Sequence, residues 1–376
     1  MSVLNSMSIL KNKYKGLILA AGYGTRLKPI TDQTPKPLIP FFNKPILFYA
    51  IDKFKEYGVN NIAINTCHLA EKIELAVQNY DVDKIVNKIS REHQILGTGG
   101  ALIPLMDWLE GSDLIIYNGD IISSIDFNKV VKQHEKSGST ATMVLLSNHL
   151  EGTNSVFVEE KLNSITNEKQ HLIRGIGKEV KVFRDEKKEN LKLMFSKHTF
   201  GCCHVLSNEF IKKSLKKVPL SGLKNGNSVN IIDFYLWSIE KNEVISAYLH
   251  NDFWEDIGTP ENLFRSHKKM LDLMKTKHQK FTDKREENFN FSKNEFVIES
   301  TPEDKKGNKI HPPSFISSKE CLSGRSEIGP NVVVCNDVKI PKDVIIKESI
   351  LLPGAVIKNG EFIERKIVGP NYQVSI

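Results

Sequence analysis

Residues 22–38 carry side chains whose types and spacing suit the binding of phosphate. The apolar run 17–21 leads directly into Gly22 and Gly24. Glycine allows positive φ and close approach, so that successive backbone N–H groups can converge on an anion. Arg26 and Lys36 add two cations, and the prolines on both sides of Lys36 limit where its ammonium group can go. The segment therefore predicts an anion-binding loop at the end of a buried strand.

The common phosphate motifs do not describe this loop. The dinucleotide fingerprint G-x-G-x-x-G fails because Leu27 stands where its third glycine belongs, and no acidic residue ends the next predicted strand, 62–66. The P-loop pattern G-x-x-x-x-G-K-[ST] is missing as well, and so are the hydrolase motifs G-x-S-x-G and H-E-x-x-H. A different phosphate-handling family must be considered.

Residues 19–38 read L-A-A-G-x-G-T-R-L-x-P-x-T-x-x-x-P-K-P-L. This string resembles the long signature of the sugar-1-phosphate nucleotidyltransferases, also called nucleotide-sugar pyrophosphorylases. The resemblance implies that Arg26 and Lys36 are catalytic. It also implies that the backbone of the loop binds the nucleotide, through Ala20, Gly22, Gly24 and Thr25.

Two aspartates match the family's metal-binding positions. Asp120 ends the sequence Asn-Gly-Asp after the apolar strand 114–117, and Asp256 lies in Trp-Glu-Asp-Ile-Gly-Thr-Pro, which resembles the family motif W-x-D-x-G-T. The resemblance implies that both hold Mg²⁺. Magnesium prefers one or two carboxylates together with phosphate oxygens and water, which a pair of aspartates satisfies.

A second glycine-rich stretch, residues 92–102, resembles the family pattern E-x-x-x-L-G-T-x-G-A-L. In the family this loop lies against the nucleobase, which implies nucleotide contacts for Gly97 and Thr98. Without the resemblance, Thr98 could equally mark the start of a helix. The Glu-Lys-Pro segment that many relatives use for the sugar phosphate is missing, so the sugar-binding residues stay open.

Strand-like runs alternate with helical patterns through the first 150 residues. The strands are expected at 17–21, 62–66, 114–117 and 142–146, and helices at about 45–57, 69–79 and 127–136. This alternation predicts βαβ units in an α/β domain with a Rossmann-like, mainly parallel sheet. Ligand sites in such sheets lie beyond the carboxyl ends of the strands, where the Gly22 loop falls.

The last segment has a different period. Apolar residues recur every six positions, at Ile328, Val334, Ile340, Ile346 and Leu352, often followed by Gly or Pro. Six-residue periodicity predicts a short β-helix, and the family resemblance implies a left-handed one. We expect a nucleotidyltransferase domain at 1–264, a polar connector at 265–310 and the repeat segment at 311–376. A chain that ends near residue 300 would then keep its chemistry and change its association state.

The composition is that of a globular protein, with 40% hydrophobic and 26% charged residues. No apolar run approaches the ~20 residues that span a bilayer, and the first 15 residues lack the apolar core of a signal peptide. The five cysteines form no CxxC pair, which suits reduced thiols. We predict a cytoplasmic protein without a membrane partner.

The net charge of +7 does not indicate nucleic-acid binding, because the lysines are scattered among acidic residues rather than interleaved with aromatics. Excess positive charge also suits anionic small substrates. A nucleoside triphosphate and a sugar 1-phosphate are the predicted partners, with homo-oligomer formation through the C-terminal repeats.

The leading hypothesis is an enzyme that joins these substrates and releases pyrophosphate. The alternatives are a non-catalytic regulatory protein of the same fold and, least favoured, an acyltransferase built on the repeats. Base and sugar stay open: mannose 1-phosphate with GTP, glucose 1-phosphate with UTP or dTTP, N-acetylmuramate or heptose phosphates, or phosphocholine with CTP.

Overall fold

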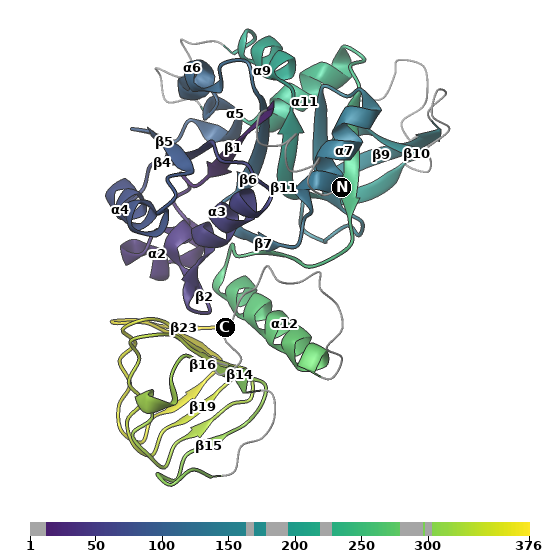
Figure 1. The fold of residues 1–376 in the computed structure, drawn as a ribbon. Helices are drawn as coiled ribbons and strands as arrows, with labels where there is room; N and C mark the ends of the chain where they lie inside the picture. Colours follow the sequence, from purple (N-terminus) through teal and green to yellow (C-terminus); the bar gives the residue numbers. More distant parts are fainter. Residues whose placement is uncertain (1–12, 163–168, 178–194, 219–227, 279–295, 298–302) are drawn as a thin grey trace. The chain divides into compact units, whose positions relative to one another are not determined.

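The protein is described by a computed structural model covering residues 13–162, 169–177, 195–218, 228–278, 296–297 and 303–376 (Figure 1). The chain divides into two compact units, and each is described by itself. Unit 1 contains residues 1–22, 50–119 and 123–254, and unit 2 contains residues 23–49, 120–122 and 255–376. The predicted domain boundaries are contiguous, whereas these compact units interleave along the chain.

Unit 1 is built on one nine-stranded sheet. In spatial order its strands are β5 (Val86–Arg91), β4 (Ile62–Thr66), β1 (Tyr14–Leu19), β6 (Asp113–Asn118), β11 (Ser196–Leu206), β8 (Ala141–Leu146), β12 (Ile245–His250), β10 (Lys169–Ile176) and β9 (Ser155–Leu162). All residues of β4 and β8 are buried, as the unalternated apolar runs in the sequence predict. The four predicted strands are confirmed as β1, β4, β6 and β8.

The sheet is mixed, which corrects the prediction of a mainly parallel one. Strands β5, β4, β1 and β6 run parallel, as do β8 and β12. Strand β11 is antiparallel to both of its neighbours, β6 and β8, and β9 and β10 form an antiparallel pair. Only six residues separate the end of β9 from the start of β10, which is fewer than the dozen or more that a parallel crossover needs.

The order of the parallel strands reverses direction beside β1. The chain goes from β1 outward through β4 to β5 and then returns to β6 on the other side of β1. Open sheets bind ligands at such a switch point, beyond the carboxyl ends of the strands. Here those ends are Leu19 and Asn118, so the residues that follow them are the glycine loop and the Gly119–Asp120 turn.

Helices cover both faces of the sheet in unit 1. They are α4 (Ala70–Tyr80), α5 (Gly97–Gly100), η3 (Ile103–Leu105), α6 (Met106–Leu109), α7 (Phe127–Ser137), α9 (Asn208–Leu215) and α11 (Ile231–Glu240). His134 of α7 contacts Thr142 of β8, whereas Met143 belongs to a core cluster with Tyr235 of α11. Because adjacent residues of a strand point to opposite faces, α7 and α11 lie on opposite sides of the sheet.

Unit 2 collects short elements from distant parts of the chain. They are η1 (Thr25–Leu27), α2 (Ile30–Gln33), η2 (Lys36–Leu38), the hairpin strands β2 (Pro40–Phe41) and β3 (Lys44–Pro45), and helix α12 (Pro260–His278). Helix α3 (Ile46–Glu56) begins in unit 2 and continues into unit 1, and β7 (Ile121–Ser123) pairs with β13 (Trp254–Asp256). Among the described residues, no helix is both long and apolar enough to cross a membrane.

The end of unit 2 forms a stack of short strands, here called the C-terminal coils (residues 309–376). One sheet contains β16 (Ser314–Ile316), β18 (Val332–Val334), β20 (Ile350–Leu351), β22 (Lys366–Val368) and β23 (Gln373–Ser375), and β14 (Phe296–Val297), which precedes the coils in the chain, pairs with β16 at its edge. The other contains β15 (Lys309–Ile310), β17 (Glu327–Ile328), β19 (Ile345–Lys347) and β21 (Phe362–Glu364), and the one-turn helix η5 (Lys319–Cys321) lies between coils.

Successive coils pair in parallel, and Ile328 stands beside Ile346, three six-residue intervals further along the chain. All five periodic positions, Ile328, Val334, Ile340, Ile346 and Leu352, are buried. The first four belong to the core inside the stack, whereas at the fifth position the neighbouring Leu351 points inside in place of Leu352.

The other predicted elements have mixed outcomes. The predicted helices at 45–57, 69–79 and 127–136 are confirmed as α3, α4 and α7. Residues 265–278 of the expected connector belong to α12, and residues 279–295 and 298–302 lie outside the described residues. The charged stretch 178–192 also lies outside them.

Buried histidines make an acid-labile fold the expected result. Nδ1 of fully buried His204 shares a hydrogen bond with the Tyr235 hydroxyl, and burial lowers the pKa of His204 to about 3. In the unfolded chain, a histidine side chain binds a proton with a pKa of about 6.5. The stability that neutral, buried His204 contributes is therefore complete above pH 6.5. It is lost as the pH falls toward 3, by about 1.4 kcal/mol per pH unit. In urea unfolding between pH 7 and 5, His204→Asn, which keeps a polar partner for Tyr235, should lose less stability than the wild type. An equal loss of stability in the variant and the wild type would contradict a role for His204 in acid lability.

Candidate functional site

The loop after Gly22 folds around one left-handed glycine. Gly24 has φ 63°, and its carbonyl accepts a hydrogen bond from the Thr31 hydroxyl at 2.9 Å. A Cβ at Gly24 would lie 2.8 Å from the Thr31 methyl group and 3.1 Å from Cβ of Lys36. Glycine is required here by its φ and by the close approach of the Lys36 segment. Gly22, by contrast, does not take positive φ, which corrects the expectation for that residue.

Lys36 brings the two predicted metal ligands together. Its Nζ lies 2.6 Å from Oδ2 of Asp120 and 3.8 Å from Oδ1 of Asp256. The lysine side chain is only 10% exposed, whereas the aspartates keep 28% and 32% exposure and can reach a ligand. The Ile257 N–H donates to the Asp120 carbonyl at 3.1 Å, which fixes the end of β13 against Asp120.

Arg26 completes the charged cluster. An added Cβ at Gly258 would lie 2.9 Å from both Nη2 of Arg26 and Oδ2 of Asp256, so the guanidinium and the carboxylate flank this glycine. Burial raises the pKa of Asp256, and the neighbouring carboxylate of Asp120 raises it further. Lys36, Arg26 and Arg265 oppose this shift. The folded protein thus holds two carboxylates where a further positive charge would stabilise both.

These residues fit a magnesium ion. The donors are two partly exposed carboxylates, and burial and then the charge of Asp120 raise the pKa of Asp256. Mg²⁺ uses one or two carboxylates beside phosphate oxygens and water. No group of three or more His, Cys, Asp or Glu side chains that could hold a metal occurs in the described part of the chain. A bound Mg²⁺ would supply charge stabilisation to phosphate oxygens, and Asp120 and Asp256 are the side chains that would hold it.

In unit 1, a buried polar network ties the start of the glycine loop to the second glycine-rich stretch. Asn65 accepts a hydrogen bond from the Ala20 N–H at 2.7 Å and donates to Oε1 of Glu92 at 2.8 Å. The other oxygen of Glu92 accepts the Leu96 N–H at 2.9 Å. The carboxylate and amide therefore hold the backbone at both places where nucleotide contacts are predicted.

The second glycine-rich stretch contains α5, whose first residue is the left-handed Gly97. This glycine has φ 82°, and a Cβ on it would lie 2.5 Å from the carbonyl oxygen of Val229. The Thr98 hydroxyl accepts the Ile231 N–H at 3.0 Å, so it caps the start of α11. Thr98 thus lies in a helical turn, and its contact with a nucleotide stays a prediction.

The structure thus assembles part of the predicted site within unit 2: Arg26, Lys36, Asp120 and Asp256 converge, with Gly24 and Thr25 in the same loop. The other predicted residues, Ala20, Gly22, Gly97 and Thr98, belong to unit 1. Sequence reasoning missed Asn65, Glu92 as a loop anchor, and Arg265. The polar side chain of Asn65 at the end of a buried strand was the available signal for the first of them.

The comparisons with known proteins agree with this geometry. Residues 15–158 match the family model described as Nucleotidyl transferase, which covers β1, the glycine loop and Asp120. The chain carries a nucleotidyl transferase domain. Residues 310–375 match a second model, the GMPPB C-terminal domain. The nucleotidyl transferase domain is therefore joined to a second recognised segment at the C-terminal coils.

Three relatives resemble the chain over about a third to nearly all of its length. A mannose-1-phosphate guanylyltransferase catalytic subunit beta from Xenopus tropicalis is 35% identical over 31% of this chain and 33% of that protein. The bifunctional protein GlmU of Methanocaldococcus jannaschii is 26% identical over 94% of this chain and 77% of its own length. An N-acetylmuramate alpha-1-phosphate uridylyltransferase from Neisseria meningitidis is 35% identical over 30% of this chain and 49% of its own. The chain thus matches about a third of the guanylyltransferase's length.

A solved structure from Bacillus anthracis, assigned as a glucose-1-phosphate thymidylyltransferase in complex with a sucrose, has a similar fold. It covers 68% of this chain and 94% of its own with a TM-score of 0.52, at 22% sequence identity. This likeness supports the nucleotidyl transferase α/β fold.

Proposed function

We propose that the protein transfers a nucleotidyl group from a nucleoside triphosphate to a sugar 1-phosphate, giving a nucleotide sugar and pyrophosphate. One observation carries the proposal: Lys36 Nζ lies 2.6 Å from Asp120 and 3.8 Å from Asp256, with Arg26 across Gly258. The reaction brings two anions together at the α-phosphorus. Fixed cations and a metal held by two carboxylates are what such a displacement needs.

The cluster also argues against a non-catalytic regulatory role. A protein that only binds a nucleotide sugar does not need buried Lys36 between two carboxylates, one of which, Asp256, has a pKa raised by burial and by the carboxylate of Asp120. Such strain in charge placement is typical of catalytic sites.

Magnesium, the C-terminal coils and the cellular location are parts of the same proposal. Asp120 and Asp256 would hold the ion. The parallel coils and their buried six-residue positions support a hexapeptide-repeat, left-handed β-helix, through which homo-oligomers would form. The five free cysteines fit the predicted cytoplasmic location.

Among the substrate pairs left open by the sequence, GTP with mannose 1-phosphate has the most support. Five relatives that are 35% identical over about a third of the chain are named as mannose-1-phosphate guanylyltransferases. The match of residues 310–375 to the GMPPB C-terminal domain adds a second, separate similarity.

A substrate panel tests this proposal. The purified full-length chain, Mg²⁺ and each pairing of GTP, UTP, dTTP, CTP or ATP with mannose, glucose or N-acetylmuramate 1-phosphate, and CTP with phosphocholine, would be followed by pyrophosphate release. We expect the highest kcat/KM for GTP with mannose 1-phosphate. Release with another pair would change the substrate assignment, and release with none would contradict the proposed activity.

A further inference from the structure

The hairpin that directly follows Lys36 is buried against two other parts of unit 2. Helix η2 contains Lys36, the Ile39 N–H donates to the Lys36 carbonyl at 3.1 Å, and β2 begins at the next residue. At the tip of the hairpin, Phe42 is fully buried with φ 56°. A bulky residue rarely takes this left-handed conformation unless its surroundings hold it there.

Both backbone groups of Phe42 have partners from distant segments. Its N–H donates to Nε2 of His267 on α12 at 2.9 Å, and its carbonyl accepts from the Cys335 thiol of the C-terminal coils at 2.9 Å. The next residue, Asn43, accepts the Asn336 N–H at 2.9 Å. These contacts, from two directions, account for the left-handed backbone.

His267 is suited to its acceptor role. Its Nδ1 lies 2.8 Å from the Leu263 carbonyl and therefore carries the proton, which leaves Nε2 free to accept the Phe42 N–H. Complete burial lowers the pKa of His267 to about 4, so this tautomer is maintained at neutral pH.

The ring of Phe42 covers an outward-facing residue of the C-terminal coils. Its centroid lies 4.9 Å from that of Phe315 and 4.8 Å from that of His267. Ile316 belongs to the core inside the coils, so its neighbour Phe315 points outward by strand alternation. Phe315 is nevertheless fully buried, as is the outward ladder Val333, Ile350 and Ile367 with which it is aligned. An outward stripe of this kind is buried only because other elements lie over it.

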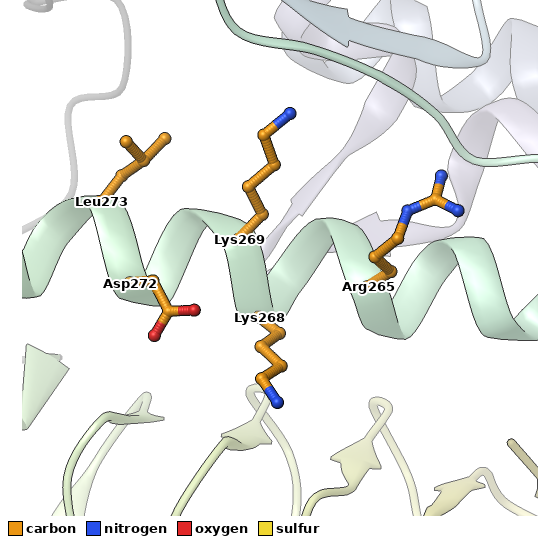
Figure 2. Close-up of a pocket in the computed structure, with 5 residues that line it drawn as sticks. All are labelled: Arg265, Lys268, Lys269, Asp272 and Leu273. Atoms are coloured by element: carbon orange, nitrogen blue, oxygen red, sulfur yellow. The ribbon is translucent and has the colours of Figure 1, made fainter. Parts of the chain in front are cut away.

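Helix α12 connects the same coils to the strand of Asp256. Glu255, 5% exposed and adjacent to Asp256, contacts Lys269 at 2.7 Å, Ser266 at 3.2 Å and Arg265 at 3.3 Å. Figure 2 shows Lys268 pointing away from Arg265 and Lys269, toward the coils, where it pairs with Glu348 at 3.8 Å. A pocket of about 310 Å³ on this helix is lined by Arg265, Lys268, Lys269, Asp272 and Leu273. One stretch of helix thus contacts the Asp256 strand, the Lys36 hairpin and the coils.

On the basis of the proposed function, we propose that Phe42 and His267 are positioning residues for nucleotidyl transfer, and that the C-terminal coils act through them. The coils and α12 fix the hairpin, and the hairpin fixes η2 and so the place of the Lys36 ammonium beside Asp120 and Asp256. A misplacement of about 1 Å can cost about 10²-fold in rate, so a remote contact of this kind has a large effect. A chain that ends near residue 300 would uncover Phe42, which changes our expectation for that truncation: it would lose chemistry as well as association.

The test removes the packing of Phe315 against Phe42 and leaves the charged residues of the site unchanged. Phe315→Ala in the full chain should lower kcat by about 10-fold or more and change KM for the triphosphate by less than about threefold. Ile363→Ala, which deletes a fully buried side chain from the inside of the coils, is the matched control and should keep kcat within about twofold. Two variants at His267 distinguish its hydrogen bond to the Phe42 N–H from the packing of its ring. His267→Gln keeps an acceptor and should retain most of kcat, whereas His267→Phe keeps a ring without an acceptor and should lose most of kcat.

Hydrogen exchange gives a readout that does not depend on activity. Peptides covering residues 36–45 should exchange faster in Phe315→Ala than in the wild type, and not in Ile363→Ala. Equal kcat losses in Phe315→Ala and Ile363→Ala, or unchanged exchange in Phe315→Ala, would overturn the positioning role. If the wild type releases no pyrophosphate with any substrate pair, the proposed function fails, and the exchange data alone decide whether the coils hold the hairpin.

Discussion

Asp256→Asn should lower kcat by about 10³-fold or more while leaving the protein at least as stable as the wild type. The loss follows from the proposed Mg²⁺ site, because a metal contributes several kcal/mol of charge stabilisation to a displacement at phosphorus. Stability should not fall, because burial and the carboxylate of Asp120 raise the pKa of Asp256, so its ionised form is disfavoured in the folded protein. Steady-state kinetics and thermal unfolding of the same preparation would measure both effects.

The control for this variant is Asp252→Asn, an exposed aspartate four positions earlier, which should keep kcat within about twofold. Asp120→Asn should match Asp256→Asn in activity, and EDTA should abolish turnover of the wild type until excess Mg²⁺ is restored. Near-normal turnover of Asp256→Asn would show that the second ligand lies elsewhere. A large fall in its melting temperature would show that the carboxylate has a structural role.

Sequence patterns were sufficient for the first half of the sheet and for the charged cluster. The buried strands β1, β4, β6 and β8 are short apolar runs, which periodicity detects, and the residues after β1 and β6 fall at the switch point. Arg26, Lys36, Asp120 and Asp256 could be chosen because each lies in a motif with unusual spacing. The roles of these four residues came from the resemblance of their motifs to those of a family, and the structure brings their side chains together.

The remaining features depend on contacts between segments far apart in the chain. The direction of β11 follows from its pairing with β6 and β8, which no local pattern encodes. Phe42 looks like any apolar residue beside a turn, and its role appears only when His267 and Cys335 are placed beside it. Asn65 and Glu92 are polar residues whose burial is decided by the network that they form.

Arg26→Ala should lower kcat by on the order of 10²-fold, the size expected when one preorganised charge-stabilising donor is removed. The guanidinium flanks Gly258 beside Asp256, where it can reach phosphate oxygens with two parallel donors. Arg26→Lys should recover little activity, because a lysine keeps the charge and loses the planar fork. Lys28→Ala, which removes an exposed cation of the same loop that pairs with Asp32 at 3.0 Å, is the control and should leave kcat within about twofold.

The division between kcat and KM decides what Arg26 does. A contact that strengthens only in the transition state lowers kcat, whereas a contact made equally in the ground state raises KM for the triphosphate. Lys36 lies between two carboxylates and is already oriented in the free protein. Arg26 is exposed, and no pair of carboxylates in the described residues holds it in the same way. We therefore expect Arg26→Ala to act on kcat and to raise KM for the triphosphate as well, because an exposed guanidinium is ordered by the phosphates that it contacts. A variant with unchanged kcat and KM would mean that Arg26 is only a solvated cation beside a glycine turn.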